Sequence, residues 1–536
     1  MGRPTTTLMG SGLSADIEKT MAPSTLNLFF LTFNCAKNLI NVGVFASHLY
    51  GALSQNATGL PDLVAFSLQE VAPMSYAFIG SYFLNPYYAR YEEALNLAAA
   101  RLLGEGSDGS EVGAQPAGVA NVRPRPYTLV RAKNVGMTAI LLFARDPSFL
   151  QSIEEAECGF GAADMGNKGA VGLRASWGDP SQHALGRTTE VTLVATHLAA
   201  MEWNLKKRNT NWRSIASSLL FANPRAVLPG LFPADTNSAP SSDRNGVVKK
   251  GTESSGSSES SEAEADDGED APEQPLLRNG DLPLTSEQRA ALRDISIFKP
   301  TSHLFVAGDL NYRISSSTPP PLSTFPSFDT SSESHYSHFL QRDQLTQERL
   351  AGRAFHGMQE APILFGPTYK YDILSSPEGA VNESAIRAGA APNGVPEIPW
   401  KFAPHRWPGW CDRVLYLGLP EWVSRKKDLE VQAYDSLPVV RTSDHRPVFL
   451  RINIPLLAAK ELIPPKGALA EESQDPRVNP PVEVDVHAWE RRAAARRKEL
   501  IVGWSAFLWS TREGALVLAT LLGLLVGAWY LWSVWM

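Results

Sequence analysis

Apolar runs of strand length recur between residues 26 and 456, and several of them stop abruptly at polar residues. In HLFVAGDLN (303–311), four apolar residues lead directly into a glycine, Asp309 and Asn311. An apolar run of this length predicts a buried strand. Burial does not account for an acid and an amide at the strand's end, so the polar end requires a separate explanation.

Six predicted strands carry polar residues at one end. The runs LNLFFLTFN, LVAFSLQE, EVTLVATHL and HLFVAGDLN end in them, and CDRVLYLGL and TSDHRPVFLRI begin with them; the residues are Asn34, Glu70, His197, Asp309, Asn311, Asp412, Asp444 and His445. One polar strand end is ordinary. Six that supply acids, amides and two histidines favour a single site at the rim of packed sheets. Strand-like runs separated by helical stretches predict an α/β fold.

Residues 514–536 carry no charged side chain. As a helix, these 23 residues would be about 35 Å long, enough to cross a bilayer core of about 30 Å. Aromatic residues gather near the end of the segment, as in a membrane-interface belt; they are Trp529, Tyr530, Trp532 and Trp535. A buried core helix is the alternative, but the length favours a C-terminal transmembrane anchor. An interfacial segment would precede it from residue 500.

Basic residues precede this span, and no charged side chain follows it. They are Arg491, Arg492, Arg496, Arg497, Lys498 and Arg512. The positive-inside rule therefore places the body of the protein in the cytosol. The three cysteines are too few for a disulfide framework, which agrees with a reducing compartment. The first residues contain no apolar stretch that predicts a signal peptide.

Composition divides the chain into four parts. Residues 1–25 are predicted to be disordered, 26–456 to form the folded domain, 457–499 to form a linker and a basic juxtamembrane segment, and 500–536 to form the interfacial segment and anchor. A disordered insertion is predicted at about 233–285, because residues 251–275 hold nine acidic residues and no basic one. The net charge of −7 without a basic stripe argues against nucleic-acid binding.

The residue types at the predicted rim favour hydrolysis. Glu70, with Asp and Asn oxygens beside it, suits a hard cation such as Mg²⁺, which would neutralise charge on a phosphoryl group. Asp309 would orient and deprotonate a water molecule, and His197 and His445 would donate hydrogen bonds to phosphoryl oxygens. Asp412 would hold His445 in one tautomer. No residue of the set is a credible covalent nucleophile, so the set predicts metal-assisted hydrolysis of a phosphate ester by water.

Each residue has a simpler explanation when it is taken alone. Glu70 could be an acid in a turn, His197 could be a structural histidine, and Asp309 could cap a turn. Asp412 could form a structural ion pair with Arg413. The combined pattern favours a common site over these separate explanations.

Eight short blocks occur in the order found in the inositol polyphosphate 5-phosphatases, which the chain resembles. They are TFNCAKN (32–38), SLQE (67–70), GNKGAVG (166–172), THLAA with LKKRN (196–209), GDLNYRI (308–314), PTYKYD (367–372), PGWCDRVLY (408–416) and TSDHRPV (442–448). GDLN and SDH fit the whole superfamily that includes deoxyribonuclease I, whereas PTYKYD and WCDRVL are specific to the 5-phosphatases. The resemblance implies a four-layer α/β sandwich of two packed mixed β-sheets flanked by helices.

The resemblance also implies roles for the matching residues. Glu70 and Asn34 would bind Mg²⁺, Asp309 would activate the water, and Asn311 would steady the water or the transition state. His197 and His445 would contact the scissile 5-phosphate, with Asp412 in support of His445 and Asp444 in the polar shell. The substrate's other phosphates would be bound by Tyr369, Lys370 and Arg406 at the 4-phosphate and by Asn167 and Lys168 near the 1-phosphate.

Two positions depart from the pattern of this family. His405 stands where a Lys or Arg is common, which puts the 4-phosphate contacts in doubt. Phe33 stands where a Trp is common, a change that concerns packing.

The predicted span narrows the resemblance to the yeast-type 5-phosphatases that are tail-anchored in the endoplasmic reticulum and act on phosphatidylinositol 4,5-bisphosphate. We therefore expect a monomeric phosphoric monoester hydrolase that acts on a phosphoinositide headgroup at the cytosolic membrane face. A nuclease or sphingomyelinase of the same fold is one alternative, which PTYKYD and the acidic composition disfavour. A catalytically inactive phosphoinositide-binding scaffold is another, which the retained polar set disfavours.

Overall fold

The computed structural model describes residues 25–57, 59–105, 124–178, 188–231, 284–376, 378, 380–381, 398–423, 427–464 and 472–536. The segments predicted to be disordered, 1–25 and about 233–285, lie almost wholly outside these residues.

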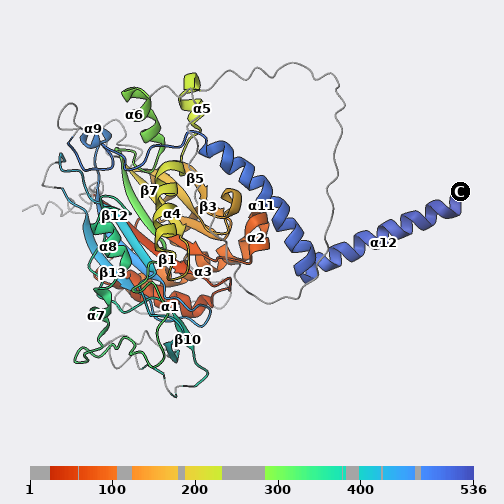
Figure 1. The fold of residues 1–536 in the computed structure, drawn as a ribbon, viewed down its shortest axis with the longest axis horizontal. Coiled ribbons are helices and arrows are strands. Elements are labelled where there is room, and N and C mark those ends of the chain that lie inside the picture. The colour runs from red at the N-terminus through yellow and green to blue at the C-terminus, as the bar shows by residue number, and fades with distance from the viewer. Residues whose placement is uncertain are drawn as a thin grey trace, which may run out of the picture.

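Two six-stranded mixed sheets form the body of the protein (Figure 1). The first has the order β13-β14-β1-β2-β4-β3, with β1 Thr25–Asn34, β2 Leu63–Gln69, β3 Thr128–Val135, β4 Thr138–Ala144, β13 Glu430–Ser436 and β14 Val448–Pro455. The second has the order β5-β6-β7-β8-β12-β9, with β5 Leu150–Gly159, β6 Gly169–Gly178, β7 Thr188–His197, β8 Ser302–Asp309, β9 Met358–Gln359 and β12 Asp412–Leu417. Each sheet has one parallel pair, β1 with β2 and β7 with β8.

Helices cover the outer faces of both sheets, so the body has four layers. Helices α1 (Val42–Ser54) and α3 (Asn85–Glu105) pack on the first sheet, and α4 (Leu205–Ser218) packs on the second. A separate apolar core lies between the sheets. Because both faces are covered, β2 and β8 are buried along their whole length, and each contains a run of four apolar residues, 63–66 in β2 and 304–307 in β8. The predicted four-layer α/β sandwich is confirmed.

Shorter elements lie in the connections. The helices are α2 Met74–Ile79, α5 Pro224–Val227, α6 Ser286–Ile295, α7 Tyr336–Leu340, α8 Gln344–Leu350 and α9 Ala459–Leu462, and the 3-10 helices are η1 Ser81–Phe83, η2 Pro147–Phe149, η3 Ala162–Asp164 and η5 Pro229–Leu231. A separate hairpin of β10 (Tyr371–Ile373) and β11 (Trp400–Phe402) is built on an aromatic cluster that includes Phe328. Lys370 directly precedes this hairpin.

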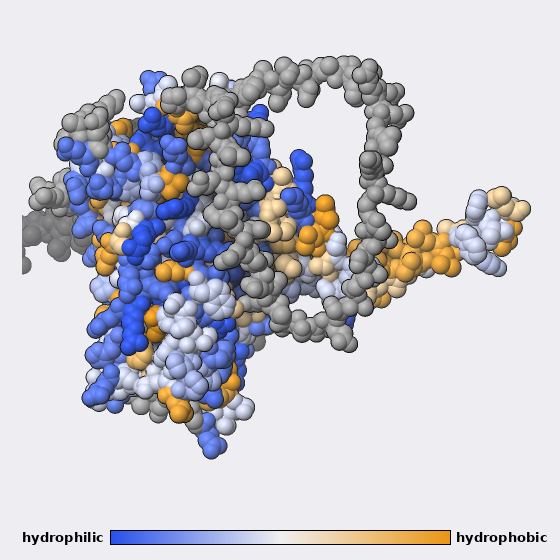
Figure 2. All heavy atoms as spheres, viewed as in Figure 1, coloured by the Kyte–Doolittle hydropathy of each residue, from blue (hydrophilic) through white to orange (hydrophobic). Residues whose placement is uncertain are grey.

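Two long helices, α11 (Ala488–Ser510) and α12 (Arg512–Trp535), form the C-terminal part (Figure 1). Helix α12 projects from the body, is long and apolar enough to be a candidate membrane span, and shows apolar side chains along its surface (Figure 2). Helix α11 lies against α2 instead.

The described parts of the region 457–499, residues 457–464 and 472–499, differ from the linker predicted there. Arg477 is only 2% exposed, and Arg491 and Arg492 form ion pairs with Asp164 and Glu157 of the body. These partners lie more than 300 positions away, so the local composition of the segment gave no sign of them.

Gly308 provides a stability test of the β7–β8 pair, because a Cβ atom at 308 would lie 2.0 Å from the carbonyl oxygen of Thr196 on β7. We expect Gly308→Ala to lower the free energy of unfolding by about 1–3 kcal/mol. Gly409→Ala is the matched control, because the nearest atom to its new Cβ is 4.0 Å away. Thermal unfolding of the full chain in detergent micelles measures both. Equal midpoints would contradict the close packing of these strands.

Candidate active site

The pairing of the strands brings five of the six predicted polar strand ends together, three in the second sheet and two in the first. In the second sheet, Asp309 at the end of β8 is the direct partner of His197 on β7 and of Asp412 on β12. In the first sheet, Asn34 ends β1 beside Gln69 of β2, and Glu70 follows directly. Because the sheets pack face to face, these ends meet at one rim.

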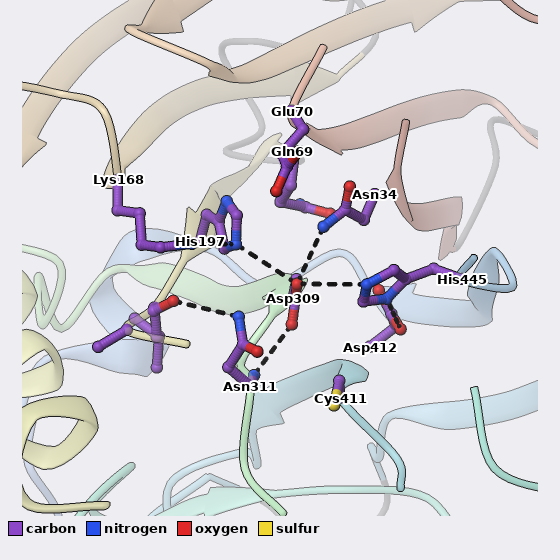
Figure 3. Close-up of polar contacts among 12 residues, drawn as sticks. Asn34, Gln69, Glu70, Lys168, His197, Asp309, Asn311, Cys411, Asp412 and His445 are labelled. Carbon is purple, nitrogen blue, oxygen red and sulfur yellow. Dashed lines mark hydrogen bonds and ion pairs between the residues drawn. The ribbon is translucent and has the colours of Figure 1, made fainter. Parts of the chain in front are cut away.

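Asp309 is the centre of the resulting polar network (Figure 3). It is 1% exposed. Its Oδ2 atom accepts a hydrogen bond from Asn34 Nδ2 at 3.0 Å and lies 3.4 Å from Nε2 of His197 and 3.9 Å from Nε2 of His445. Its Oδ1 atom accepts from the backbone N–H of Asn311 at 3.0 Å. The carboxylate therefore joins both sheets.

The two histidines differ in protonation. Burial alone would lower the pKa of His445, but the carboxylates of Asp412, Asp309 and Asp444 raise it to about 9. Burial and the charge of Lys168 lower the pKa of His197. At neutral pH, His445 is therefore a cation and His197 is neutral.

The carboxylates beside His445 remain ionised at neutral pH. Burial alone would raise the pKa of Asp309, but the positive charges of His445 and Lys168 hold it below its usual range. Burial raises the pKa of Asp412 to about 6, and the charge of His445 opposes the rise. His445 Nδ1 lies 2.8 Å from Asp412 Oδ2, so Asp412 fixes the imidazolium and aims Nε2 at the centre of the site.

Lys168 reaches the site from the turn between β5 and β6. Its Nζ atom lies 2.8 Å from Nε2 of His197 (Figure 3). The buried Nδ1 atom of His197 has no hydrogen-bond partner among the described residues. The ammonium group thus places positive charge beside a neutral imidazole, which suits an anionic ligand.

Two site residues hold an unusual backbone conformation. Glu70 and Asn311 have φ angles of 46° and 55°, a left-handed region that Asn tolerates and Glu rarely adopts. Such strain costs about 1–3 kcal/mol and persists where the surroundings enforce it. For Asn311 the enforcing contacts are its N–H to Asp309 and its Nδ2 to the carbonyl of Leu198 at 3.2 Å.

Basic and aromatic groups line the other side of the centre. The rings of Tyr369 and His445 lie 4.5 Å apart, and the guanidinium of Arg313 lies 4.6 Å from the Tyr369 ring centre. Lys370 pairs with Asp444 at 2.9 Å. Arg406 pairs with the buried carboxylate of Glu202 and remains partly exposed.

Asn167 has no part in the polar contacts recorded among the described site residues. It is exposed, and its side chain lies against Gly161, where a Cβ atom would meet its Oδ1 at 1.8 Å. The backbone turn brings the neighbouring Lys168 to His197. It therefore places the side chain of Asn167 away from the site.

Three supporting residues were missed at the sequence level. Thr368 donates its hydroxyl to Asp412 at 2.7 Å, Arg313 contacts the side chain of Asn311, and Glu202 binds Arg406. Thr368 and Arg313 lie inside the blocks PTYKYD and GDLNYRI, which was the available signal. Glu202 follows THLAA and carried no such signal.

The donor set fits a divalent cation. Asp309, Asp412 and His445 offer ligand atoms within 4.8 Å of one another, and the buried Oδ1 atom of Asp412 has no hydrogen-bond partner among the described residues. The protonated His445 is not a ligand, which leaves oxygen donors. Asn34 contacts Asp309, and Glu70, whose carboxylate lies 3.6 Å from Lys37 Nζ, is on the same side of Asp309, away from Asn311 (Figure 3). Oxygen donors of this kind suit a hard cation.

Comparison with known proteins agrees with the resemblance to the inositol polyphosphate 5-phosphatases. Residues 31–451 match the Endonuclease/Exonuclease/phosphatase family 2. Inositol-1,4,5-trisphosphate 5-phosphatase 1 of Schizosaccharomyces pombe is 24% identical over 330 residues, which are 60% of this chain and 19% of that protein. Phosphatidylinositol polyphosphate 5-phosphatase type IV of Mus musculus is 30% identical over 194 residues, which are 34% of this chain and 25% of that protein.

A similar solved structure is the inositol polyphosphate 5-phosphatase domain of SPsynaptojanin, in complex with inositol (1,4)-bisphosphate and a calcium ion. It is 19% identical, with a TM-score of 0.46 over 88% of this chain and 92% of that chain.

The chain belongs to the Endonuclease/Exonuclease/phosphatase family 2, since the match covers most of its length. Its relatives confirm the resemblance to the inositol polyphosphate 5-phosphatases. The matched region is a quarter or less of the length of either relative.

The opposite protonation of the two histidines is testable in the metal-free protein. We expect Asp412→Asn to lower the pKa of His445 from about 9 towards the ordinary value of about 6.5, because a neutral amide no longer offsets the burial of the cation. NMR titration of the imidazole carbons of the full chain in micelles measures this. His197, which contacts Lys168 and not Asp412, is the internal control. An unchanged His445 pKa would show that Asp412 does not hold the imidazolium.

Proposed function

We propose that the protein is a Mg²⁺-dependent phosphoinositide 5-phosphatase that removes the 5-phosphate of phosphatidylinositol 4,5-bisphosphate at a cytosolic membrane face. The observation that carries this proposal is the buried, ionised Asp309 between His197 and His445. A carboxylate in that position can accept a proton from water while two imidazoles face a phosphoryl group. The relatives named above act on inositol polyphosphates or phosphoinositides.

Direct attack by water fits this site better than a covalent intermediate. Cys411 lies nearby, but it is fully buried and burial raises the pKa of its thiol far above the usual range. A protonated, buried thiol is a poor nucleophile. Asp309 would orient the water and accept its proton, and Asn311 would hold the Asp309 carboxylate through its N–H.

Glu70 and Asn34 would hold Mg²⁺, with Asp309 and Asp444 completing the polar surroundings. When bound there, Mg²⁺ would neutralise charge on the phosphoryl oxygens and lower the pKa of the attacking water. His445, held as a cation by Asp412, would donate Nε2–H to a phosphoryl oxygen as negative charge develops. His197 and Lys168 would bind the phosphate from the opposite side.

Tyr369, Lys370 and Arg406 would form the clamp on the 4-phosphate. Among the described residues, Lys370 and Arg406 each have one carboxylate partner, Asp444 and Glu202. A doubly charged phosphate competes well for such cations. His405 is exposed and stands where a Lys or Arg is common in the family, so the clamp has one Lys or Arg side chain fewer than is usual there.

Helix α12 would anchor the enzyme in a membrane, and we propose the endoplasmic reticulum because the span is long and rich in Leu and Trp. Tethering raises the local concentration of a membrane substrate without new contacts. A monomer suffices, because all the proposed site residues come from one chain.

Phosphate release from short-chain phosphatidylinositol 4,5-bisphosphate tests the proposed reaction. The full chain in detergent micelles should release phosphate with Mg²⁺ and stop when EDTA is added. We expect Asp309→Ala to lower kcat/KM by at least about 100-fold, since it removes the proton acceptor. Asp146→Ala is the matched control, because this exposed acid caps η2.

Three outcomes would overturn the assignment. A folded protein that binds the headgroup without releasing phosphate would be a phosphoinositide-binding scaffold. Release that does not need Asp309 would require another proton acceptor. Hydrolysis of a different phosphoester only would indicate another hydrolase of this fold.

The clamp predicts a dependence on the 4-phosphate. We expect Lys370→Ala to raise KM for phosphatidylinositol 4,5-bisphosphate about tenfold, because a charge-assisted hydrogen bond is lost, and to change KM little for phosphatidylinositol 5-phosphate. Lys401→Ala, on the exposed face of β11, is the control. Equal changes for the two lipids would place Lys370 outside the 4-phosphate subsite.

A further inference from the structure

The face of α11 that packs on the body contains a buried carboxylate. The buried residues of this helix recur every seven or four positions and so lie on one face; they are Ala488, Ala495, Glu499, Gly503 and Phe507. The Glu499 side chain is 0% exposed. A buried charge is costly unless it is paired and hydrogen-bonded, so its partners indicate what this face does.

Three neighbours satisfy the Glu499 carboxylate. Arg492, on the same helix, donates Nη1 to Oε1 at 2.6 Å and Nη2 to Oε2 at 2.8 Å. Gly166 donates its backbone N–H to Oε1 at 2.7 Å, and Arg496 Nη1 lies 3.4 Å from Oε2. Gly166 lies in the turn between β5 and β6, so Glu499 joins α11 to that turn.

The two arginines extend the attachment to other segments. Arg492 donates Nε to Glu157 of β5 at 2.9 Å and Nη1 to the carbonyl oxygen of Asp164 at 3.2 Å. Arg496 donates to the carbonyl oxygens of the last two residues of α2 at 2.6 and 3.2 Å. Those carbonyls lack partners within the helix, so Arg496 caps α2.

Close packing fixes the position of α11. A Cβ atom at Gly503 would lie 2.9 Å from Cβ of Phe78 and 3.1 Å from the backbone nitrogen of Ile79. One turn further on, the ring of Phe507 lies 5.2 Å from that of Phe83. The absence of a side chain at 503 lets the helix approach α2, and contacts on both sides of it prevent a slip along the helix axis.

The turn that Glu499 holds also delivers Lys168 to the active site. Lys168 follows Gly166 by two residues, and its Nζ atom lies 2.8 Å from His197 Nε2 (Figure 3). Gly166 has little room, because a Cβ atom there would lie 2.5 Å from Cγ1 of Val135. Its carbonyl oxygen accepts from the N–H of Met137 at 3.3 Å. A displacement of Gly166 therefore displaces Lys168.

We propose that Glu499 is a positioning residue for Lys168, and that α11 belongs to the catalytic unit because it holds the turn that carries Lys168. This inference rests on the proposed function, because it takes Lys168 to contact the substrate phosphate. It goes beyond that function because α11 lies outside residues 31–451, the part of the chain that matches the family. Since α11 leads through Thr511 into α12, the candidate membrane helix is connected to an active-site cation by a continuous set of contacts.

A purely structural role for Glu499 makes a different prediction. If Glu499 only stabilised the fold, its loss would lower the unfolding midpoint and would act on kcat independently of Lys168. A positioning residue acts through Lys168, so its effect on kcat disappears when Lys168 is absent.

The experiment compares full-length variants in detergent micelles. Glu499→Ala removes the acceptor of the Gly166 N–H, whereas Glu499→Gln keeps an oxygen there. Glu490→Ala is the matched control, because Glu490 lies on the same helix and pairs with Arg225 rather than with the turn. Amide hydrogen exchange of residues 159–169 and kcat on short-chain phosphatidylinositol 4,5-bisphosphate are measured for each.

We expect Glu499→Ala to speed exchange in residues 159–169 about tenfold and to lower kcat about tenfold. Glu499→Gln should have a smaller effect, and Glu490→Ala should leave both values unchanged. In a Lys168→Ala background, Glu499→Ala should change kcat no further. If Glu499→Ala does not fold, Arg492→Lys, which loses the paired donor geometry, should show the same pattern.

Unchanged exchange in residues 159–169 would overturn the proposal. An equal loss of kcat with and without Lys168 would also overturn it, and would leave Glu499 a structural role. Failure of the proposed function is distinguishable, because the wild-type chain itself would then release no phosphate, while the exchange measurement would still decide whether Glu499 holds the turn.

Discussion

The burial of a charged carboxylate where two sheets meet is the constraint on which this structure depends. Asp309 is 1% exposed, and the burial of an ion costs several kcal/mol unless donors surround it. Its hydrogen-bond donors come from both sheets: Asn34 from the first and the backbone N–H of Asn311 from the second. A second bond between the sheets, from the Ser67 hydroxyl to the carbonyl of Ala307 at 2.8 Å, holds this same end. The sandwich therefore cannot slip without leaving the charge unpaired.

The different protonation states of the two histidines follow from the charges around them. Both are buried, and burial lowers the pKa of each. His445 faces Asp412, Asp309 and Asp444, which together outweigh burial and keep it charged. His197 faces Lys168, which adds to the effect of burial. Two histidines thus differ in charge: His445 is a cation on one side of Asp309, and His197 is a neutral ring on the other.

The sequence was sufficient for the centre of the site, because strand ends are local features. An apolar run predicts a strand, and its first polar residue marks where burial stops, so Asp309, His197 and Asn34 could be placed at one rim before any contact was known. Supporting contacts lacked such a signal. Glu202 and Arg406 are 204 positions apart, and Gly166 and Glu499 are 333 apart. Only packing brings these pairs together, which is also why the composition of 457–499 predicted a linker.

The arginines before α12 show how the same residues can satisfy two different requirements. As a sequence, they are the basic flank of a candidate membrane span. In the structure, Arg492 and Arg496 neutralise Glu499 and reach β5 and α2. A buried ion network contributes little net stability compared with apolar packing, but it penalises every alternative register. A slip of α11 by one turn would leave Glu499 without the Gly166 N–H. The network therefore specifies where α11 sits and, through it, where α12 leaves the body.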